Sequence, residues 1–416
     1  MNLLLSGFSL ILIVLTIEAK LIEKFSWKQT EFDWPNPEAK QKAIESGQYI
    51  VENNLPLGVE RWQNKLFITV PRWKSGVAAS LNYVDLNTED KSPKLKPYPN
   101  WEAHNLPLAA AAGDMGTPLQ DNSTVISPFR VQADACDRLW VLDTGVIDLL
   151  GDTKQIAPNA IIIFDLKTDK LIRRYELPKN QVKDESFLAN IIVDSDRSEC
   201  DKAYAYMPDL GAYTLIVYSF RDNHSYRIVH HYFHFDPLQG DFNVGGVNFQ
   251  WTDGIFGMAI GPMNPDHSKD IYFHPLASTK EFKVSDHVLR NESYVTSKDA
   301  FFEFKLVGDR GMNGQSTAEV YDKETGVIFY TQINKDAIAC WNVKRPYNPD
   351  TQGLVDSDSQ TLIFPNDMKI DTEGNLWVLS DKMPTYIYKT LDMEKVNFRV
   401  FSGKIRDLIK GTNCEL

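Results

Sequence analysis

The densest group of side chains that could bind a metal is the run His230-His231-Tyr232-Phe233-His234. In a strand, His230 and His234 would share a face with Tyr232, and imidazole nitrogens are common metal ligands. A third ligand is not evident beside them, so we expect these histidines to pack or to face solvent. The sequence has no HExxH or CxxC pattern, which would indicate zinc, and no GxSxG pattern, which would indicate a serine hydrolase. We therefore expect neither a bound metal nor another cofactor.

Carboxylates recur beside two segments that resemble each other. Residues 131–145 read VQADACDRLWVLDTG and residues 368–382 read MKIDTEGNLWVLSDK. Each has an aspartate, a polar turn, the run Leu-Trp-Val-Leu and a polar residue, which is typical of a strand, a tight turn and a buried strand. Asp134 and Asp367 are therefore expected to organise turns, and Asp253 is expected to cap the turn before another buried strand.

Weaker copies of this unit predict the architecture that positions these residues. The second strands of six such units would begin near residues 66, 139, 203, 271, 327 and 376, about 62 residues apart on average. Four strands fit into that length, and no long helical periodicity lies between the units. The sequence thus predicts an all-β, six-bladed β-propeller, in which residues 25–34 supply the outer strand that closes the ring. A two-domain α/β protein is the alternative, but it lacks helix signals and a glycine-rich phosphate loop.

Composition and charge agree with such a fold and exclude one class of partner. The 416 residues include 9 Trp, 17 Tyr, 22 Phe, 23 Gly and 21 Pro, which suits many short strands joined by turns. The net charge of −12 argues against nucleic-acid binding, which requires a basic surface. It is compatible with binding a neutral or cationic small molecule.

The first residues indicate export. Residues 3–17 form an apolar run that is too short for a comfortable membrane span, and Ala19 stands at a plausible cleavage point. We interpret 1–19 as a secretory signal peptide and 20–416 as one propeller domain that is secreted and not bound to membranes. An uncleaved N-terminal anchor is the alternative.

The cysteines and the sequons fit an extracellular protein. Four cysteines allow three pairings, and we expect Cys136–Cys200 and Cys340–Cys414 because each of these bonds would join neighbouring units. Acceptor patterns for N-glycosylation lie at Asn122, Asn223 and Asn291.

Several motifs together resemble a known family. They are RLWVLDTG, DGIFGMAIGP at 253–262, ACWN at 339–342, FPNDMKIDTEGNLWVLSDKMP at 364–384 and GTNC at 411–414. Their combination, over residues 25–416, resembles the insect yellow and major royal jelly protein family. SDKMP and NFRVF at 397–401 are similar to the yellow-f type, members of which are associated with dopachrome conversion in melanin formation. The resemblance implies a six-bladed propeller and a role in cuticle pigmentation, amine binding, dopachrome conversion or nutrition.

The resemblance also implies candidate ligand positions. In amine-binding salivary relatives, contacts come from the last blade, and the matching positions here are Asn366, Asp381 and Met383. The corresponding places in the second unit add further candidates for the central channel. These are Phe129, Arg130, Gln132 and Thr144.

Dopachrome conversion to 5,6-dihydroxyindole is a tautomerisation, which needs a base, a proton donor and charge stabilisation but no redox cofactor. The resemblance implies a possible set, with Asp381 as the base, Asn366 as the donor and Arg130 as the anchor for the substrate carboxylate. The ligand would be a small aromatic molecule, namely dopachrome, a catecholamine or a biogenic amine. The alternatives are a non-catalytic binder of such compounds, a structural pigmentation factor, and a lactonase-like propeller with calcium in its channel.

Overall fold

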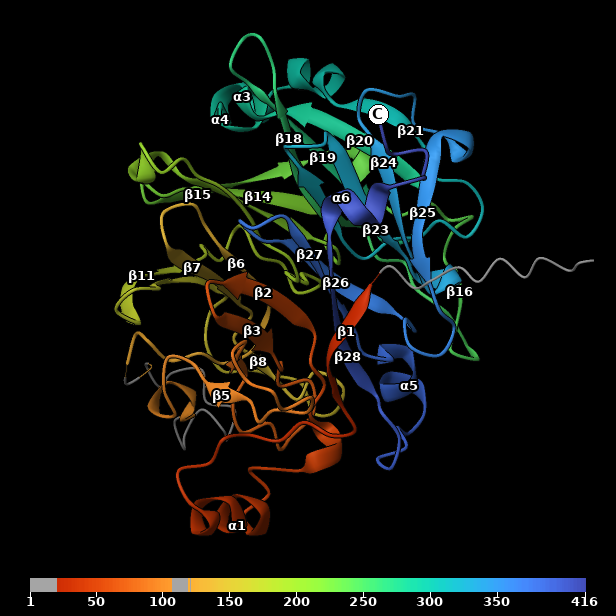
Figure 1. Cartoon of the computed structure of the whole chain (residues 1–416). Helices are drawn as coiled ribbons and strands as arrows, with labels where there is room; N and C mark the ends of the chain where they lie inside the picture. The colour runs from red at the N-terminus through yellow and green to blue at the C-terminus, as the bar shows by residue number, and fades with distance from the viewer. Residues whose placement is uncertain (1–20, 107–118, 120) are drawn as a thin grey trace, which may run out of the picture.

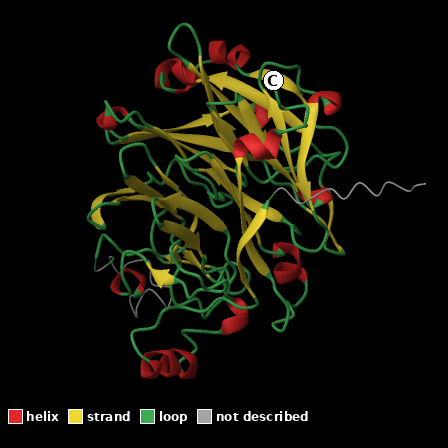
Figure 2. Cartoon of the chain, viewed as in Figure 1, coloured by secondary structure: helices red, strands yellow, loops and turns green. Residues whose placement is uncertain are grey.

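Six four-stranded antiparallel sheets form the blades of a β-propeller, as predicted (Figure 1). The computed structural model describes residues 21–106, 119 and 121–416, so the predicted signal peptide lies outside the described residues. Strands and loops make up most of the chain, and the helices are few and short (Figure 2). Within the described part, no helix has the length and apolar character needed to cross a membrane.

Each blade is a meander whose first strand lies at the central axis, with β1 added at the outer edge of the last blade. From the axis outward the blades are β2 (Gly58–Trp62), β3 (Lys65–Thr69), β4 (Leu81–Asp85) and β5 (Lys96–Pro97); β6 (Pro128–Ala133), β7 (Arg138–Asp143), β10 (Ala160–Asp165) and β11 (Lys170–Glu176); β12 (Ile192–Asp194), β13 (Tyr204–Asp209), β14 (Thr214–Ser219) and β15 (His224–Val229); β18 (Ile255–Met263), β19 (Lys269–Pro275), β20 (Lys280–Ser285) and β21 (Lys305–Asp309); β22 (Glu319–Asp322), β23 (Val327–Gln332), β24 (Ala337–Asn342) and β25 (Gln352–Ser357); and β26 (Pro365–Ile370), β27 (Asn375–Ser380), β28 (Phe398–Lys404) and β1 (Ile22–Trp27).

Two hairpins and several short helices lie between or after these strands. They are β8 (Val146–Ile147) with β9 (Lys154–Gln155), β16 (Asp241–Val244) with β17 (Val247–Gln250), the α-helices α1 (Pro37–Glu45), α3 (Asp286–Leu289), α4 (Glu292–Val295), α5 (Met383–Tyr388) and α6 (Ile405–Ile409), and the 3₁₀ helices η1 (Val51–Asn53), η2 (Glu102–His104), η3 (Cys200–Lys202), η4 (His231–Phe233), η5 (Lys298–Glu303), η6 (Ile333–Lys335) and η7 (Pro349–Thr351).

The N-terminal strand closes the ring. β1 pairs antiparallel with β28, so the first and last parts of the described chain lie side by side (Figure 1). The strand begins three residues before the predicted segment and ends at Trp27, whose indole Nε1 donates to Pro93 O at 2.8 Å. Phe32 then forms a bridge with Leu95 beside the first blade. The predicted segment therefore connects the last blade to the first.

The six-unit repeat is confirmed by the second strands, which begin at residues 65, 138, 204, 269, 327 and 375. In the two strongest copies an aspartate fixes the tryptophan of the next strand. Asp134 Oδ2 accepts from Trp140 Nε1 at 2.8 Å, and Asp371 Oδ2 accepts from Trp377 Nε1 at 2.7 Å. The turn role of Asp134 is confirmed, but in the last blade this role belongs to Asp371 and not to Asp367.

The core lies between the blades, and strands in the middle of a sheet are covered on both faces. All six residues of β7 are buried, which explains why the Leu-Trp-Val-Leu run is continuously apolar and not alternating. Both predicted disulfides are present. Cys136–Cys200 joins the second and third blades, and Cys340–Cys414 joins β24 to the C-terminal tail.

Candidate functional site

The innermost strands all begin on one face of the propeller, which we call the entry face. The loops that follow the second strands reach the same face because the two strands are antiparallel. This geometry brings the start of β26, with Asn366, next to the end of β27, where Asp381 follows. It likewise brings Phe129 in β6 next to Thr144, which follows β7.

Asn366, Asp381 and Met383 lie together, as the resemblance implies. Asn366 Nδ2 donates to Asp381 Oδ2 at 2.5 Å and lies 3.9 Å from the Met383 sulfur, and Met383 N donates to Asp381 Oδ1 at 3.0 Å. Asp381 is 0% exposed and Asn366 1%. Burial raises the pKa of Asp381 to about 8, although its hydrogen bonds and Arg130 favour the charged form. The pair can therefore hold a proton at neutral pH.

Arg130 lies against this cluster, but both of its Nη groups donate hydrogen bonds within the protein. Nη1 donates to Thr317 O at 3.0 Å, and Nη2 donates to the Asn366 carbonyl oxygen. Nε lies 3.3 Å from Asp367 Oδ1, and the guanidinium stacks on Phe256 at 4.2 Å from the ring centroid. Arg130 thus joins β6, β26 and the segment that leads into β22, and its Nη groups would hold a substrate carboxylate only after releasing these partners.

Asp367 has a comparable role between blades. Its Oδ2 accepts from Val59 N of β2 at 3.0 Å, while Oδ1 faces Arg130. The expectation that Asp367 organises a turn is therefore wrong, because its side chain points toward neighbouring innermost strands. Gln132 also joins two blades, since its Oε1 accepts from Val193 N at 2.9 Å.

Phe129 and Thr144 line an open cavity of about 650 Å³ on the entry face. The rings of Trp73 and Phe187 complete its aromatic wall, with centroids 5.0 Å and 5.4 Å from that of Phe129. Lys183 is among the polar residues that line it. Sequence reasoning missed Trp73 and Phe187. Trp73 follows the second strand of the first blade, as Thr144 and Asp381 follow theirs, and that shared position could have indicated it.

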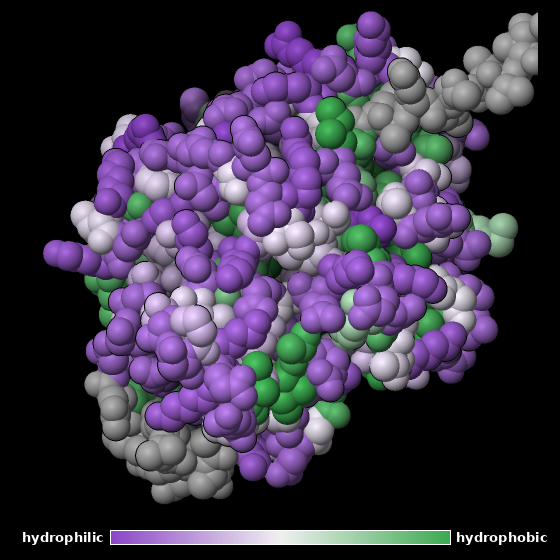
Figure 3. Space-filling model, turned by 60° about the horizontal axis from the view of Figure 1, so that its bottom comes forward, coloured by the Kyte–Doolittle hydropathy of each residue, from purple (hydrophilic) through white to green (hydrophobic). Residues whose placement is uncertain are grey.

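A second cavity, of about 680 Å³, opens on the opposite face and is lined by residues from all six innermost strands. It contains Gln132 and reaches as deep as Arg130 and Asp367. It also contains Glu60, a residue not predicted from the sequence, whose pKa burial raises to about 8. Figure 3 shows that polar side chains cover most of the surface in that view and that apolar side chains gather in separate places.

The histidine run is structural. It forms η4 and not a strand, so the assumed shared face does not exist. His230 is 3% exposed, stacks on Phe304 with ring centroids 4.1 Å apart, and bonds to Phe301 O through Nε2. Burial lowers its pKa to about 4, so its imidazole is neutral.

Comparisons with known proteins agree with the fold and the motifs. The major royal jelly protein family matches residues 126–414. "Protein yellow" of Drosophila pseudoobscura pseudoobscura is 42% identical over 99% of this chain and 72% of its own length, and that of Drosophila melanogaster is 42% identical over 95% and 71%. Among solved structures, a protein of unknown function from Bacteroides thetaiotaomicron aligns with a TM-score of 0.50, covering 92% of this chain and 75% of that one at 9% identity, which bears on the fold alone. The chain therefore belongs to the yellow and major royal jelly protein family.

Proposed function

We propose that this protein acts in melanin pigmentation by binding a small aromatic molecule, such as dopachrome or a catecholamine, in the entry-face cavity. The observation that carries the proposal is the wall formed by Trp73, Phe129 and Phe187 around a space of about 650 Å³. Cavities of this size accommodate small organic ligands, and aromatic side chains stack on planar rings. Lys183 can pair with a carboxylate, and Asp184 can pair with an amine.

Conversion of bound dopachrome to 5,6-dihydroxyindole is the second candidate. In this reaction a proton leaves the carbon beside the carboxylate while the quinone-imine gains one. Asp381, with its raised pKa and its bond to Asn366, is a carboxyl that can take up and return a proton near neutral pH. It is buried and does not line the entry-face cavity, so it would reach bound dopachrome only after the segments around it move. The similarity of SDKMP and NFRVF to the yellow-f type supports the same reaction.

We also propose that the protein is secreted. Two disulfides support this compartment, because such bonds persist in oxidising surroundings. The three predicted glycosylation sites, Asn122, Asn223 and Asn291, all lie on exposed turns or helix ends, where a glycan has room. The negative net charge supports a small-molecule ligand over a nucleic acid.

Phe187→Ala is expected to weaken binding of the stable catechols L-DOPA and dopamine by roughly three- to tenfold, because one stacking face of the cavity is lost. Isothermal titration calorimetry measures the change. Phe302→Ala is the matched control, since Phe302 is 73% exposed and does not line the cavity, and it should bind as the unaltered protein does. Equal affinities in the two variants would place the ligand elsewhere.

Asp381→Asn tests the conversion separately from binding. If Asp381 moves the proton, this variant should lose most of its dopachrome turnover, on the order of 10²-fold, while still binding L-DOPA. The loss of dopachrome absorbance is followed beside heat-treated protein, and circular dichroism checks that the variant is folded. Full turnover in folded Asp381→Asn would remove Asp381 from the reaction without affecting the binding proposal.

A further inference from the structure

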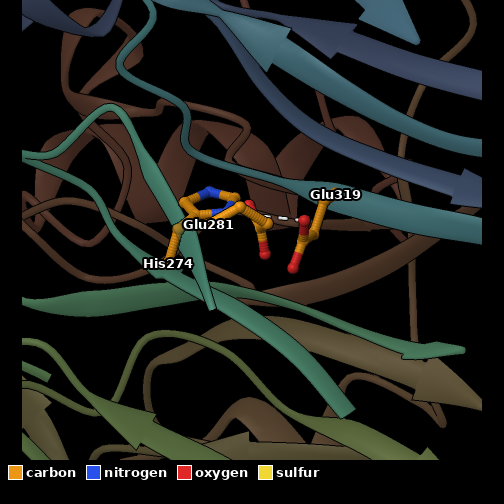
Figure 4. A group of neighbouring side chains, drawn as sticks. All are labelled: His274, Glu281 and Glu319. Carbon is orange, nitrogen blue, oxygen red and sulfur yellow. Dashed lines mark hydrogen bonds and ion pairs between the residues drawn. The ribbon is translucent and has the colours of Figure 1, made fainter. Parts of the chain in front are cut away.

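Three buried side chains that the proposed function does not use meet at the boundary between the fourth and fifth blades (Figure 4). They are His274 in β19, Glu281 in β20 and Glu319 in β22. His274 Nδ1 lies 3.0 Å from Glu281 Oε2 and 3.4 Å from Glu319 Oε2. All three side chains are at most 1% exposed, so water does not screen them.

The group is incompletely satisfied. Oε1 of Glu281 and Oε1 of Glu319 have no hydrogen-bond partner among the residues that the structure describes. Figure 4 shows the two carboxylates side by side, each reaching toward the other from a different blade. A buried carboxylate oxygen without a partner is costly, and two of them in one place form an environment that a cation stabilises.

The charged side chains nearby do not fully balance the two carboxylates, so a cation would be stabilised there. Arg310 Nη1 lies 2.7 Å from Glu281 Oε2, so this guanidinium balances one of the two carboxylates. Its other donors are occupied, because Nε donates to Gly314 O and Nη2 to Ser278 O. Among the described residues, Glu319 has one ion-pair contact, with the imidazole of His274, and Arg310 acts on it from farther away.

We propose that His274, Glu281 and Glu319 bind one divalent transition-metal ion, such as Zn²⁺ or Mn²⁺. The ligand atoms lie within 4.8 Å of one another, which is compatible with a shared ion at bond lengths of about 2.0–2.2 Å. An imidazole nitrogen in the set favours a first-row transition metal over Ca²⁺ or Mg²⁺, which prefer oxygen ligands alone. Three protein ligands leave a fourth position for water or a small ligand.

The opposite-face cavity supplies a route for the ion, because Glu319 lines it. Gly257 fixes the place of the imidazole on the other side. A Cβ at Gly257 would lie 2.2 Å from His274 Nε2, so only glycine allows the ring to lie there. A ligand set with a defined geometry beside a cavity is compatible with a metal site.

The test uses the full protein, stripped with a chelator and reconstituted separately with Zn²⁺, Mn²⁺, Ca²⁺ and Mg²⁺. Elemental analysis after desalting should find one Zn²⁺ or Mn²⁺ per chain, and the ion should raise the melting temperature. Glu319→Gln and Glu281→Gln should each weaken binding at least tenfold. Glu60→Gln is the matched control, since it removes another buried carboxylate of the same cavity and should leave the stoichiometry unchanged.

Visible absorption of the Co²⁺-loaded protein adds a readout that does not depend on the variants' stability, because the band reports a nitrogen and oxygen ligand field directly. Binding of one ion that both glutamine variants weaken supports the site. Failure of the reconstituted protein to retain Zn²⁺ or Mn²⁺ would overturn it. Retention of Ca²⁺ alone, or unchanged binding in both glutamine variants, would overturn it as well.

Discussion

Replacing Arg130 by methionine is expected to lower the free energy of unfolding by about 3–5 kcal/mol, as measured by urea denaturation. The guanidinium is 1% exposed and joins β6 to β26 and to the segment before β22, through Thr317 O, the Asn366 carbonyl and Asp367. Methionine fills much of the same space but leaves the two carbonyl oxygens without these donors. It also leaves Asp367 with its backbone donors and the more distant Lys369 ammonium, 3.9 Å away.

Arg406→Met is the control for this result. Arg406 is 82% exposed and pairs with Glu324 at 3.5 Å on the surface, so its loss should change stability by less than about 1 kcal/mol. If Arg130 serves mainly as a carboxylate anchor, Arg130→Met should unfold as the unaltered protein does and lose only affinity for carboxylated ligands. L-DOPA and dopamine, which differ in the carboxylate, separate these two outcomes.

The fold could be predicted from the sequence because each blade repeats a strand, a turn and a buried strand, and two blades share the same hydrogen bond between the turn and that strand. Asp134 and Trp140 in one unit, and Asp371 and Trp377 in another, form the same hydrogen bond between a turn and a strand. Such a repeat recurs at a spacing that is visible in the sequence. From that spacing, the start of each second strand was predicted to within two residues. The disulfide pairing could be predicted from the order of the repeat units, since each bond joins neighbouring units.

The candidate site was less predictable because side chains at equivalent repeat positions have different surroundings. Asn366 and Asp381 lie together, but they are sealed within the protein. Gln132 lies in the cavity on the opposite face, and its amide holds a neighbouring blade. Which residue of a repeat faces a cavity depends on the packing between blades, and the sequence of one blade does not contain that information.

The aromatic wall and the proposed metal ligands illustrate the same limit. Trp73 and Phe187 come from connections in different blades, and their closeness to Phe129 arises only when the first three blades pack side by side. Glu319 belongs to a different blade from His274 and Glu281. By contrast, of the histidines that are close in sequence, His230 is held by packing and backbone bonds, while His231 and His234 are exposed.

The free energy of unfolding is expected to fall as the pH rises from 6.5 to 8, because buried carboxyls that are protonated in the folded protein must ionise. Burial raises the pKa of Asp381 from 3.8, and that of Glu60 from 4.5, to about 8 in the folded protein. Between pH 4.5 and about pH 8, the folded protein keeps a proton on Asp381 and one on Glu60 that the unfolded chain has released. A higher pH therefore favours unfolding. Each group contributes at most about 1.4 kcal/mol per pH unit.

Other buried groups limit the pH range over which the free energy of unfolding is expected to fall. Burial lowers the pKa of His104 to about 3 and that of His230 to about 4, so both oppose the trend below their ordinary value of 6.5. Above that value the unfolded histidines also lose their protons, and their opposing contribution fades by about pH 7.5. Asp253, whose pKa burial raises to about 7, acts in the same direction as Asp381 and Glu60.

Urea denaturation at pH 6.5, 7.0, 7.5 and 8.0 measures the slope of the free energy of unfolding against pH. Asp381→Asn and Glu60→Gln should each flatten it, and the two variants combined should remove most of it, because an amide does not titrate in this range. A slope that is positive, or that both substitutions leave unchanged, would mean that these carboxyls are ionised in the folded protein. In that case Asp381 could not hold a proton near neutral pH, and its proposed part in the conversion of dopachrome would lose its physical basis.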